Sequence, residues 1–201
     1  MNLHLEQLLH RVPALESCAP DIERAFGTLR DCFAAGGKAL ACGNGGSAAD
    51  AEHWAGELLK GMRKARRLDP HPELPPRLAE RLQGALPMIP LTGFLSYHTA
   101  FGNDVDPELV FAQLVWALGR PGDVLVAIST SGQSENVCAA AEAATAKGMP
   151  VIALTGAAGG RRGDLAGIAL RVPARETHLV QELHLPVYHC LSLMLEDEFF
   201  A

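Results

Sequence analysis

The stretch DVLVAISTSGQSENV (Asp123–Val137) indicates the class of fold, because it passes from one kind of structure to another over a few residues. It begins with small and branched apolar residues, which are typical of a strand buried on both faces of a sheet. A loop rich in hydroxyls follows, and Ser134 stands where it can cap a helix. A strand, a polar loop and a helix in this order predict one unit of a parallel α/β sheet.

The same pattern occurs along the rest of the chain. Apolar runs predict strands at residues 38–42, 86–91, 123–128, 150–155 and 168–172. Helical periodicity predicts an N-terminal extension of two helices within residues 1–35, at 3–16 and 21–35, and a last helix at 176–198. A chain of 201 residues can bury one large core, so we expect one α/β domain over residues 1–201, with helices on both faces of a parallel sheet.

Residues 63–87 interrupt this regular order. Five prolines precede or bracket a short helix predicted at residues 76–82, and we interpret the segment as a surface insertion that acts as a lid or a subunit contact. The segment also begins with a local group of basic residues, Arg63, Lys64, Arg66 and Arg67.

Composition excludes several classes of function. The formal net charge of −6 argues against non-specific binding to nucleic acid or to an anionic membrane. No apolar stretch reaches the roughly 18 residues of a membrane span, and the charged N-terminus does not resemble a signal peptide. The five cysteines form no CxxC pair, so we expect buried thiols in a reducing cytoplasm. The expected location is therefore cytoplasmic.

Two loops follow strands at the same edge of the predicted sheet and suit one phosphate group. In CGNGGSAADAEHW, the glycines Gly43, Gly45 and Gly46 allow the backbone to approach a ligand, and Ser47 is expected to cap a helix starting at Ala48. In STSGQSE, hydroxyls take the place of the glycines. Neither loop carries a dinucleotide or P-loop motif, so we expect a monophosphorylated small molecule held by hydroxyls and helix N-termini.

Two helical segments carry residues that bind metals or transfer protons. His53 and Glu57 are four residues apart and share one helical face, which fits a metal site or an ordinary exposed polar pair. The segment QELHLPVYH offers Gln181, Glu182 and His189 on the last helix. Ideal spacing pairs Glu182 with His189, but the intervening Pro186 is expected to kink or unwind the helix, so spacing alone does not choose between Glu182 and Gln181.

The motifs CGNGGSAADAEH, GRPGDVLVAISTSGQSENV, GMPVIALTG and VQELHLPVYH resemble the sugar-isomerase (SIS) domain family, and within it the phosphoheptose isomerases. The resemblance implies a five-stranded parallel sheet of flavodoxin-like order. It also implies a homotetramer with active sites between subunits. The implied activity is the isomerisation of sedoheptulose 7-phosphate to D-glycero-D-manno-heptose 7-phosphate through an enediol.

The resemblance also implies roles for particular residues. Glu57 and His189 match the proton-transfer residues. The positions that hold Zn²⁺ in the family match His53, Glu57, Gln181 and His189. The substrate-binding positions match Asn44, Gly45, Gly46, Ser47, Asn103, Asp104, Ser129, Thr130, Ser131, Ser134 and Gln181.

The chain departs from the family at His178, where an aspartate is common, and in the length of the segment at residues 63–87. The competing interpretation is a non-catalytic SIS tetramer, such as the bacterial regulator that binds the replication initiator DnaA. That protein does not keep the carboxylate and imidazole that Glu57 and His189 provide here. Phosphosugar-sensing transcriptional regulators would need a helix-turn-helix domain, for which this chain has no room.

Overall fold

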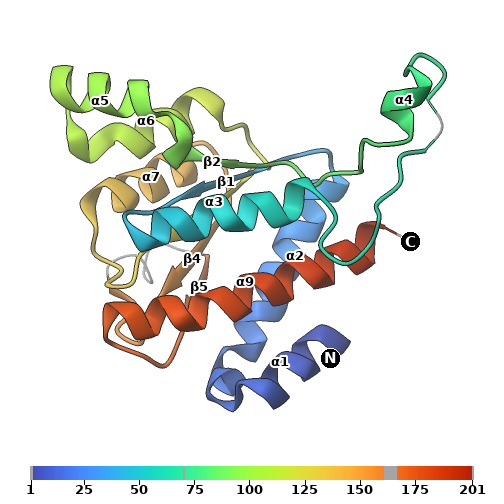
Figure 1. The fold of residues 1–201 in the computed structure, drawn as a ribbon. Coiled ribbons are helices and arrows are strands. Elements are labelled where there is room, and N and C mark those ends of the chain that lie inside the picture. The colour runs from blue at the N-terminus through green and yellow to red at the C-terminus, as the bar shows by residue number, and fades with distance from the viewer. Residues whose placement is uncertain (1, 70, 161–166, 201) are drawn as a thin grey trace.

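The computed structural model describes residues 2–69, 71–160 and 167–200. Its centre is a five-stranded, all-parallel sheet in the order β2-β1-β3-β4-β5, which is the expected flavodoxin-like order (Figure 1). All five predicted strands are present, each within two residues of its predicted bounds. The strands are β1 (Ala39–Cys42), β2 (Met88–Pro90), β3 (Val124–Ile128), β4 (Val151–Thr155) and β5 (Ile168–Arg171).

Helices cover both faces of this sheet, as predicted (Figure 1). One face carries α1 (Leu3–Arg11), α2 (Ala19–Ala34), α3 (Gly46–Leu59) and α9 (Thr177–Phe199). The other carries α5 (Leu95–Asp104), α6 (Val110–Leu118) and α7 (Glu135–Ala146). Because alternate residues of a strand point to opposite faces, Val124 and Val126 pack into the first core, whereas Leu125 and Ala127 pack into the second.

Two proline predictions need correction. The first helix does not run to residue 16: α1 ends at Arg11, and Pro13 opens a 3₁₀ helix, η1 (Pro13–Cys18). Proline has no amide hydrogen and its ring clashes with the preceding turn, so the α-helix ends just before it. The unwinding expected at Pro186 does not occur, since α9 continues through it from Thr177 to Phe199, and the alternative of a kink stays a prediction.

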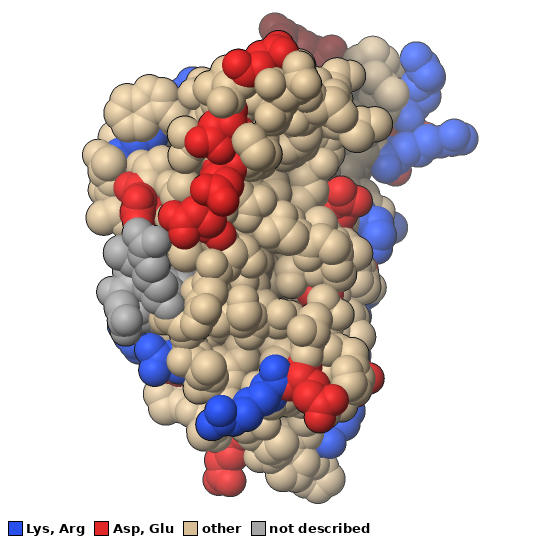
Figure 2. All heavy atoms as spheres, turned by 90° about the vertical axis from the view of Figure 1, so that its left-hand side faces the viewer, with Lys and Arg blue, Asp and Glu red and all other residues tan. Residues whose placement is uncertain are grey.

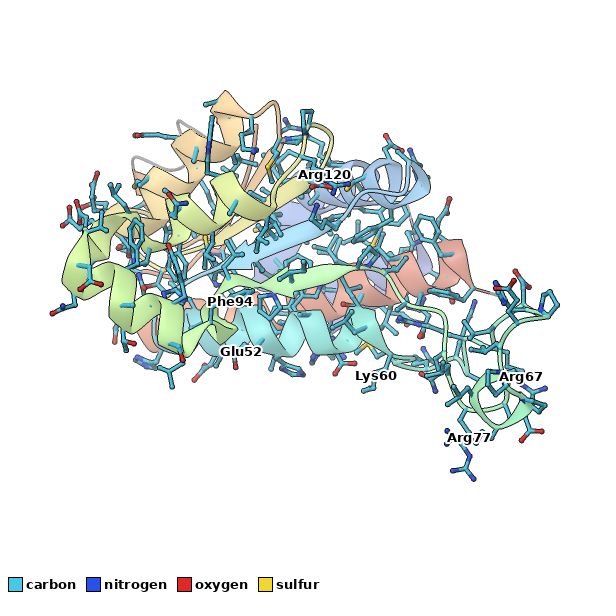
Figure 3. The ribbon with its side chains drawn as sticks, turned by 90° about the horizontal axis from the view of Figure 1, so that it is seen from above. Glu52, Lys60, Arg67, Arg77, Phe94 and Arg120 are labelled. Carbon is cyan, nitrogen blue, oxygen red and sulfur yellow. The ribbon has the colours of Figure 1, made fainter. Side chains whose placement is uncertain are left out.

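The predicted insertion forms an arm at the C-terminal end of α3. Its helix α4 (Pro76–Ala79) is a single turn, shorter than the predicted 76–82, and buries none of its residues. Figures 1 and 3 show the arm projecting from the body, with Arg67 and Arg77 at a distance from the sheet. The predicted group of basic residues is not a uniform surface patch, because Arg66 is buried and pairs with Glu196.

Two expectations drawn from composition can be compared with the described residues. The five cysteines are buried free thiols, as expected. Among the helices that the structure describes, none combines the length and apolar character needed to cross a bilayer.

Candidate active site

A hollow of about 290 Å³ lies where the loops after β1 and β3 meet the start of α9. Ile128 and Thr177 contribute to its lining. The other lining residues are eight of the predicted substrate-binding residues: Asn44, Gly45, Gly46, Ser47, Ser129, Thr130, Ser134 and Gln181. Among the residues that the structure describes, no lysine or arginine lines it. The hollow therefore has the neutral, hydroxyl-rich lining that the sequence indicated for a phosphate.

The glycine loop brings the backbone close to Gln181. Gly45 has a φ of 56°, a left-handed conformation that glycine adopts at little cost, and it occupies the N-cap position of α3. A Cβ at Gly46 would lie 2.4 Å from Gln181 Nε2, so only glycine leaves room for that amide. The prediction that Ser47 caps the helix is wrong: α3 already begins at Gly46, and Ser47 is a buried residue of its first turn.

The serine loop is tied to the glycine loop by side chains. Ser129 is buried, and its hydroxyl lies 3.1 Å from that of Ser134, which occupies the N-cap position of α7. The side-chain amides of Asn44 and Asn136 donate to each other's oxygens at 2.9 and 3.0 Å. These contacts hold the N-terminal ends of α3 and α7 at the same hollow, where their partial positive charges favour an anion.

Figure 2 faces the edge of the sheet at which the strands end. Acidic side chains gather over the upper part of this face, and lysine and arginine are sparse near its middle. Within the described residues, hydroxyls and helix N-termini are therefore the groups that can attract a phosphate into the hollow.

His53, Glu57 and His189 meet on the seam between α3 and α9. One ligand atom from each lies within 4.8 Å of the others. The i,i+4 spacing of His53 and Glu57 places Nε2 3.3 Å from Oε1, and the rings of His53 and His189 have centroids 5.1 Å apart. At Zn–N distances of 2.0–2.1 Å, tetrahedral ligand atoms lie about 3.3 Å apart, so the three groups need to close by no more than about 1.5 Å to hold zinc.

His189 has further properties of a metal ligand. Its Nε2 atom is buried and has no hydrogen-bond partner within the described residues. Burial lowers the pKa of His189 below its ordinary value, and the neighbouring His53 lowers it further, whereas Glu57 opposes the shift. A lowered pKa favours the neutral imidazole, which is the form that binds metals. The residues present therefore fit a zinc site.

His53 has a partner on its other nitrogen. Its Nδ1 lies 2.9 Å from the hydroxyl of Tyr188, and Tyr188 donates to Asp50 Oδ1 at 3.4 Å. Burial raises the pKa of Tyr188, and the carboxylate of Asp50 raises it further. The tyrosine therefore remains a neutral hydroxyl beside the imidazole.

The remaining predicted site residues lie outside these two groups. The hydroxyl of Ser131 accepts from the Gln133 amide and does not line the hollow. Asn103 and Asp104 are exposed in the last turn of α5, where they hydrogen-bond to each other at 2.8 Å. Gln181 lies two turns before His189 on an unbroken helix, so its place among the metal ligands stays a prediction, and Glu182 is exposed.

Three site residues were not singled out from the sequence. Thr177 lines the hollow because α9 begins there, Asn136 links the two loops, and Tyr188 contacts His53. Tyr188 contacts residues of α3 because α3 and α9 pack side by side, and this pairing of distant segments is not visible in either segment alone.

Comparison with known proteins identifies the family. A model of the SIS domain matches residues 4–74 and 77–156. The phosphoheptose isomerase of Rhodospirillum rubrum is 44% identical over 183 residues, which is 91% of this chain and 88% of that protein. The enzyme of the same name from Shewanella loihica is 43% identical over 94% of this chain and 89% of its own length.

Solved structures give the same answer. The phosphoheptose isomerase of Neisseria gonorrhoeae superposes with a TM-score of 0.79 at 36% identity, covering 96% of this chain and 95% of that one. The enzyme from Francisella tularensis gives 0.78 at 36% identity, covering 93% and 91%. The parallel sheet and its two loops thus define an SIS domain. Within that family the chain belongs to the phosphoheptose isomerases, which are sugar-phosphate isomerase enzymes.

Proposed function

We propose that the chain isomerises sedoheptulose 7-phosphate to D-glycero-D-manno-heptose 7-phosphate. One observation carries this proposal: the hollow and the His53, Glu57 and His189 cluster lie on the same seam between α3 and α9. Along α3, Gly46 at the hollow and His53 in the cluster are seven residues apart, which is about 10 Å at 1.5 Å per residue. The curated relatives and solved structures named above support the same activity.

This separation favours a long sugar phosphate. In a heptose 7-phosphate, the phosphate and the carbons that react lie at opposite ends of the chain. A phosphate in the hollow would then direct the carbonyl end along the seam towards Glu57 and His189. In a triose phosphate these two groups are adjacent, so it would not reach both.

The hydroxyls of the hollow are assigned to the phosphate. Ser47, Ser129, Thr130 and Ser134 would donate to its oxygens, together with backbone amides at the N-terminal ends of α3 and α7. Gln181 lines the hollow and lies two turns before His189 on α9, which suits contact with the sugar. Ser131, Asn103 and Asp104 are exposed and are assigned to substrate contacts made in the assembled oligomer.

Glu57 and His189 are assigned to proton transfer. Glu57 removes the proton from the carbon next to the carbonyl and returns a proton to the former carbonyl carbon, and His189 moves the second proton between the two oxygens. The carboxylate oxygens of Glu57 have different neighbours, since Oε1 faces His53 at 3.3 Å and Oε2 faces Lys60 at 3.6 Å. Oε1 is therefore the oxygen that faces the other proposed metal ligands.

Zinc is the proposed cofactor, with His53, Glu57 and His189 as ligands and Gln181 as the fourth. Bound there, Zn²⁺ would polarise the two substrate oxygens and stabilise the enediolate. The ligand types and the buried, unpartnered Nε2 of His189 support this assignment.

A homotetramer in the cytoplasm is also proposed. Large apolar side chains are exposed on three helices, among them Leu95 on α5, Trp116 on α6 and Leu179 on α9, with 75%, 58% and 40% of their surface accessible. A second copy could cover these residues. The five free thiols support a reducing compartment.

A panel of phosphosugars tests the function. Zinc-loaded protein is incubated with sedoheptulose 7-phosphate, with fructose 6-phosphate and with unphosphorylated sedoheptulose, and the products are followed by NMR. We expect the aldose from sedoheptulose 7-phosphate, slower turnover of the shorter phosphosugar, and no turnover without the phosphate. If none of the phosphosugars is converted although zinc is bound, the chain is not an isomerase.

A further inference from the structure

The two ring nitrogens of His53 have different kinds of partner. Nε2 lies 3.3 Å from Glu57 Oε1, in the cluster proposed to bind zinc. Nδ1 lies 2.9 Å from the hydroxyl of Tyr188, which in turn donates to Asp50 Oδ1 at 3.4 Å. The ring of Tyr188 is 1% exposed and stacks on buried Trp54, with centroids 5.7 Å apart and planes at 19°. Its hydroxyl is therefore held at a fixed place.

A count of protons shows how this arrangement acts on His53. The hydroxyl of Tyr188 has one proton to donate, and an ionised Asp50 can only accept. When Tyr188 donates to Asp50, its oxygen accepts from the Nδ1–H of His53, so that Nε2 keeps a free lone pair. When Tyr188 donates to Nδ1 instead, the proton of His53 is on Nε2, where it faces Glu57 Oε1 and blocks metal binding.

Asp50 favours the first arrangement. Its Oδ2 is buried and has no hydrogen-bond partner within the described residues, and its Oδ1 accepts from the hydroxyl of Tyr188. Leaving a buried carboxylate without a donor costs free energy, which disfavours turning the tyrosine proton away from it. Burial raises the pKa of Asp50, and the hydrogen bond from Tyr188 opposes that rise by stabilising the carboxylate.

We propose that Tyr188 and Asp50 are positioning residues that hold His53 as the Nδ1–H tautomer and so present its Nε2 lone pair to the metal. This inference rests on the proposed zinc site. Neither residue touches the substrate in this account, and both act through His53. Outer hydrogen-bond partners of metal-binding histidines typically change metal affinity by about 10–100-fold when they are removed.

Two substitutions and a matched control test the proposal. Tyr188→Phe removes the hydroxyl and keeps the ring that stacks on Trp54. Asp50→Asn keeps the shape but adds an N–H donor, which can reverse both hydrogen bonds and place the histidine proton on Nε2. Tyr97→Phe is the control, because its hydroxyl donates to the Val110 carbonyl at a distance from His53. Zinc affinity is measured by competition with a chromophoric chelator, and ¹⁵N NMR of the zinc-free protein reports the tautomer.

We expect zinc affinity to fall about 10–100-fold in both variants and to stay unchanged in Tyr97→Phe. We also expect the NMR spectrum to show Nδ1–H on His53 in the wild-type protein and Nε2–H in Asp50→Asn, with His53→Gln used for assignment. Because the wild-type spectrum needs no substitution, an Nε2–H tautomer there overturns the proposal even if a variant fails to fold.

The remaining outcomes separate this proposal from the proposed function. Zinc affinity that depends on His53 but is unchanged in Tyr188→Phe and Asp50→Asn overturns the positioning role alone. Zinc content that is unaffected by His53→Gln overturns the metal site together with it. The phosphosugar assay is independent of both results.

Discussion

Arg66 is hydrogen-bonded directly to the backbone of Glu57. Its Nη2 donates to the Glu57 carbonyl at 3.0 Å and its Nη1 to the Leu58 carbonyl at 2.7 Å, so it satisfies the last turn of α3. Its Nε pairs with Glu196 Oε1 at 2.8 Å, and both side chains are buried. The proposed proton-transfer residue is thus anchored, through its backbone, to a buried ion pair between the segment that follows α3 and helix α9.

Replacing Arg66 should cost stability. Arg66→Met leaves Glu196 as a buried carboxylate without its cation and removes the cap of α3. Loss of one partner from a buried pair typically costs about 3–5 kcal/mol, and we expect a loss of this size in the free energy of unfolding, measured with urea. Arg67→Met is the control, since Arg67 is exposed on the arm. A loss below about 1 kcal/mol for Arg66→Met would contradict the account.

Acid should remove the contribution of Glu196 to the stability of the fold. Burial alone would raise its pKa, but hydrogen bonds from the Met62 and Arg63 amides and from Arg66 outweigh burial and lower it below the ordinary value of 4.5. The folded state therefore binds this proton more weakly than the unfolded chain. The stabilisation is present above about pH 4.5 and is lost as the pH falls through the folded-state pKa.

The matched variant for this test is Glu196→Gln. We expect the wild-type protein to be more stable than the variant at pH 7 and the difference to shrink below pH 4.5, as measured by urea unfolding across the pH range. A difference that stays constant with pH would show that the charge of Glu196 does not contribute.

Much of the fold follows from local patterns. The strand at residues 123–128 is recognisable because it is apolar on both faces, and the loop after it because the hydroxyls begin where the apolar run ends. Proline was harder to interpret. Pro13 ends α1, whereas Pro186 lies within α9, where packing of the helix against α2 and α3 keeps it continuous.

Replacing Gly46 should weaken substrate binding and leave the stability of the fold nearly unchanged. In Gly46→Ala the new Cβ would displace the flexible amide of Gln181, which costs the fold little but disturbs the hollow. We expect a near-normal unfolding midpoint and a KM for the phosphosugar raised about tenfold or more, which corresponds to about 1.4 kcal/mol. Gly27→Ala, where a Cβ meets nothing within 4 Å, is the control. An unchanged KM would mean that Gln181 does not contact the substrate.

Ser129 should contribute to binding of the phosphate. In Ser129→Ala a buried hydroxyl of the hollow is lost, and a hydrogen bond to a charged group is worth about 1.5–3 kcal/mol, so we expect the Kd for the phosphosugar to rise about 10–100-fold. Thr145→Ala removes a hydroxyl that bonds only within α7 and should leave the Kd unchanged. Calorimetry would measure both. Equal affinities for the two variants would place the phosphate elsewhere.

The site could be predicted only in part. The spacing of His53 and Glu57 on one helix was enough to pair them, and the side chains do meet. Ideal helical spacing paired Glu182 with His189, but Glu182 is exposed. The contacts of Tyr188 and Arg66 depend on how α3, α9 and the segment between residues 60 and 67 pack together, and such long-range packing has no signal in a single segment.

Solvent exchange tests the central claim, that Glu57 transfers a proton on a phosphorylated sugar bound along the α3–α9 seam. Zinc-loaded protein is incubated with sedoheptulose 7-phosphate in D₂O, and deuterium at the carbon next to the carbonyl is measured by NMR. We predict incorporation by the wild-type protein and a rate at least about 100-fold lower for Glu57→Gln. Equal rates for the two proteins, or no incorporation by the zinc-loaded wild type, would contradict the account.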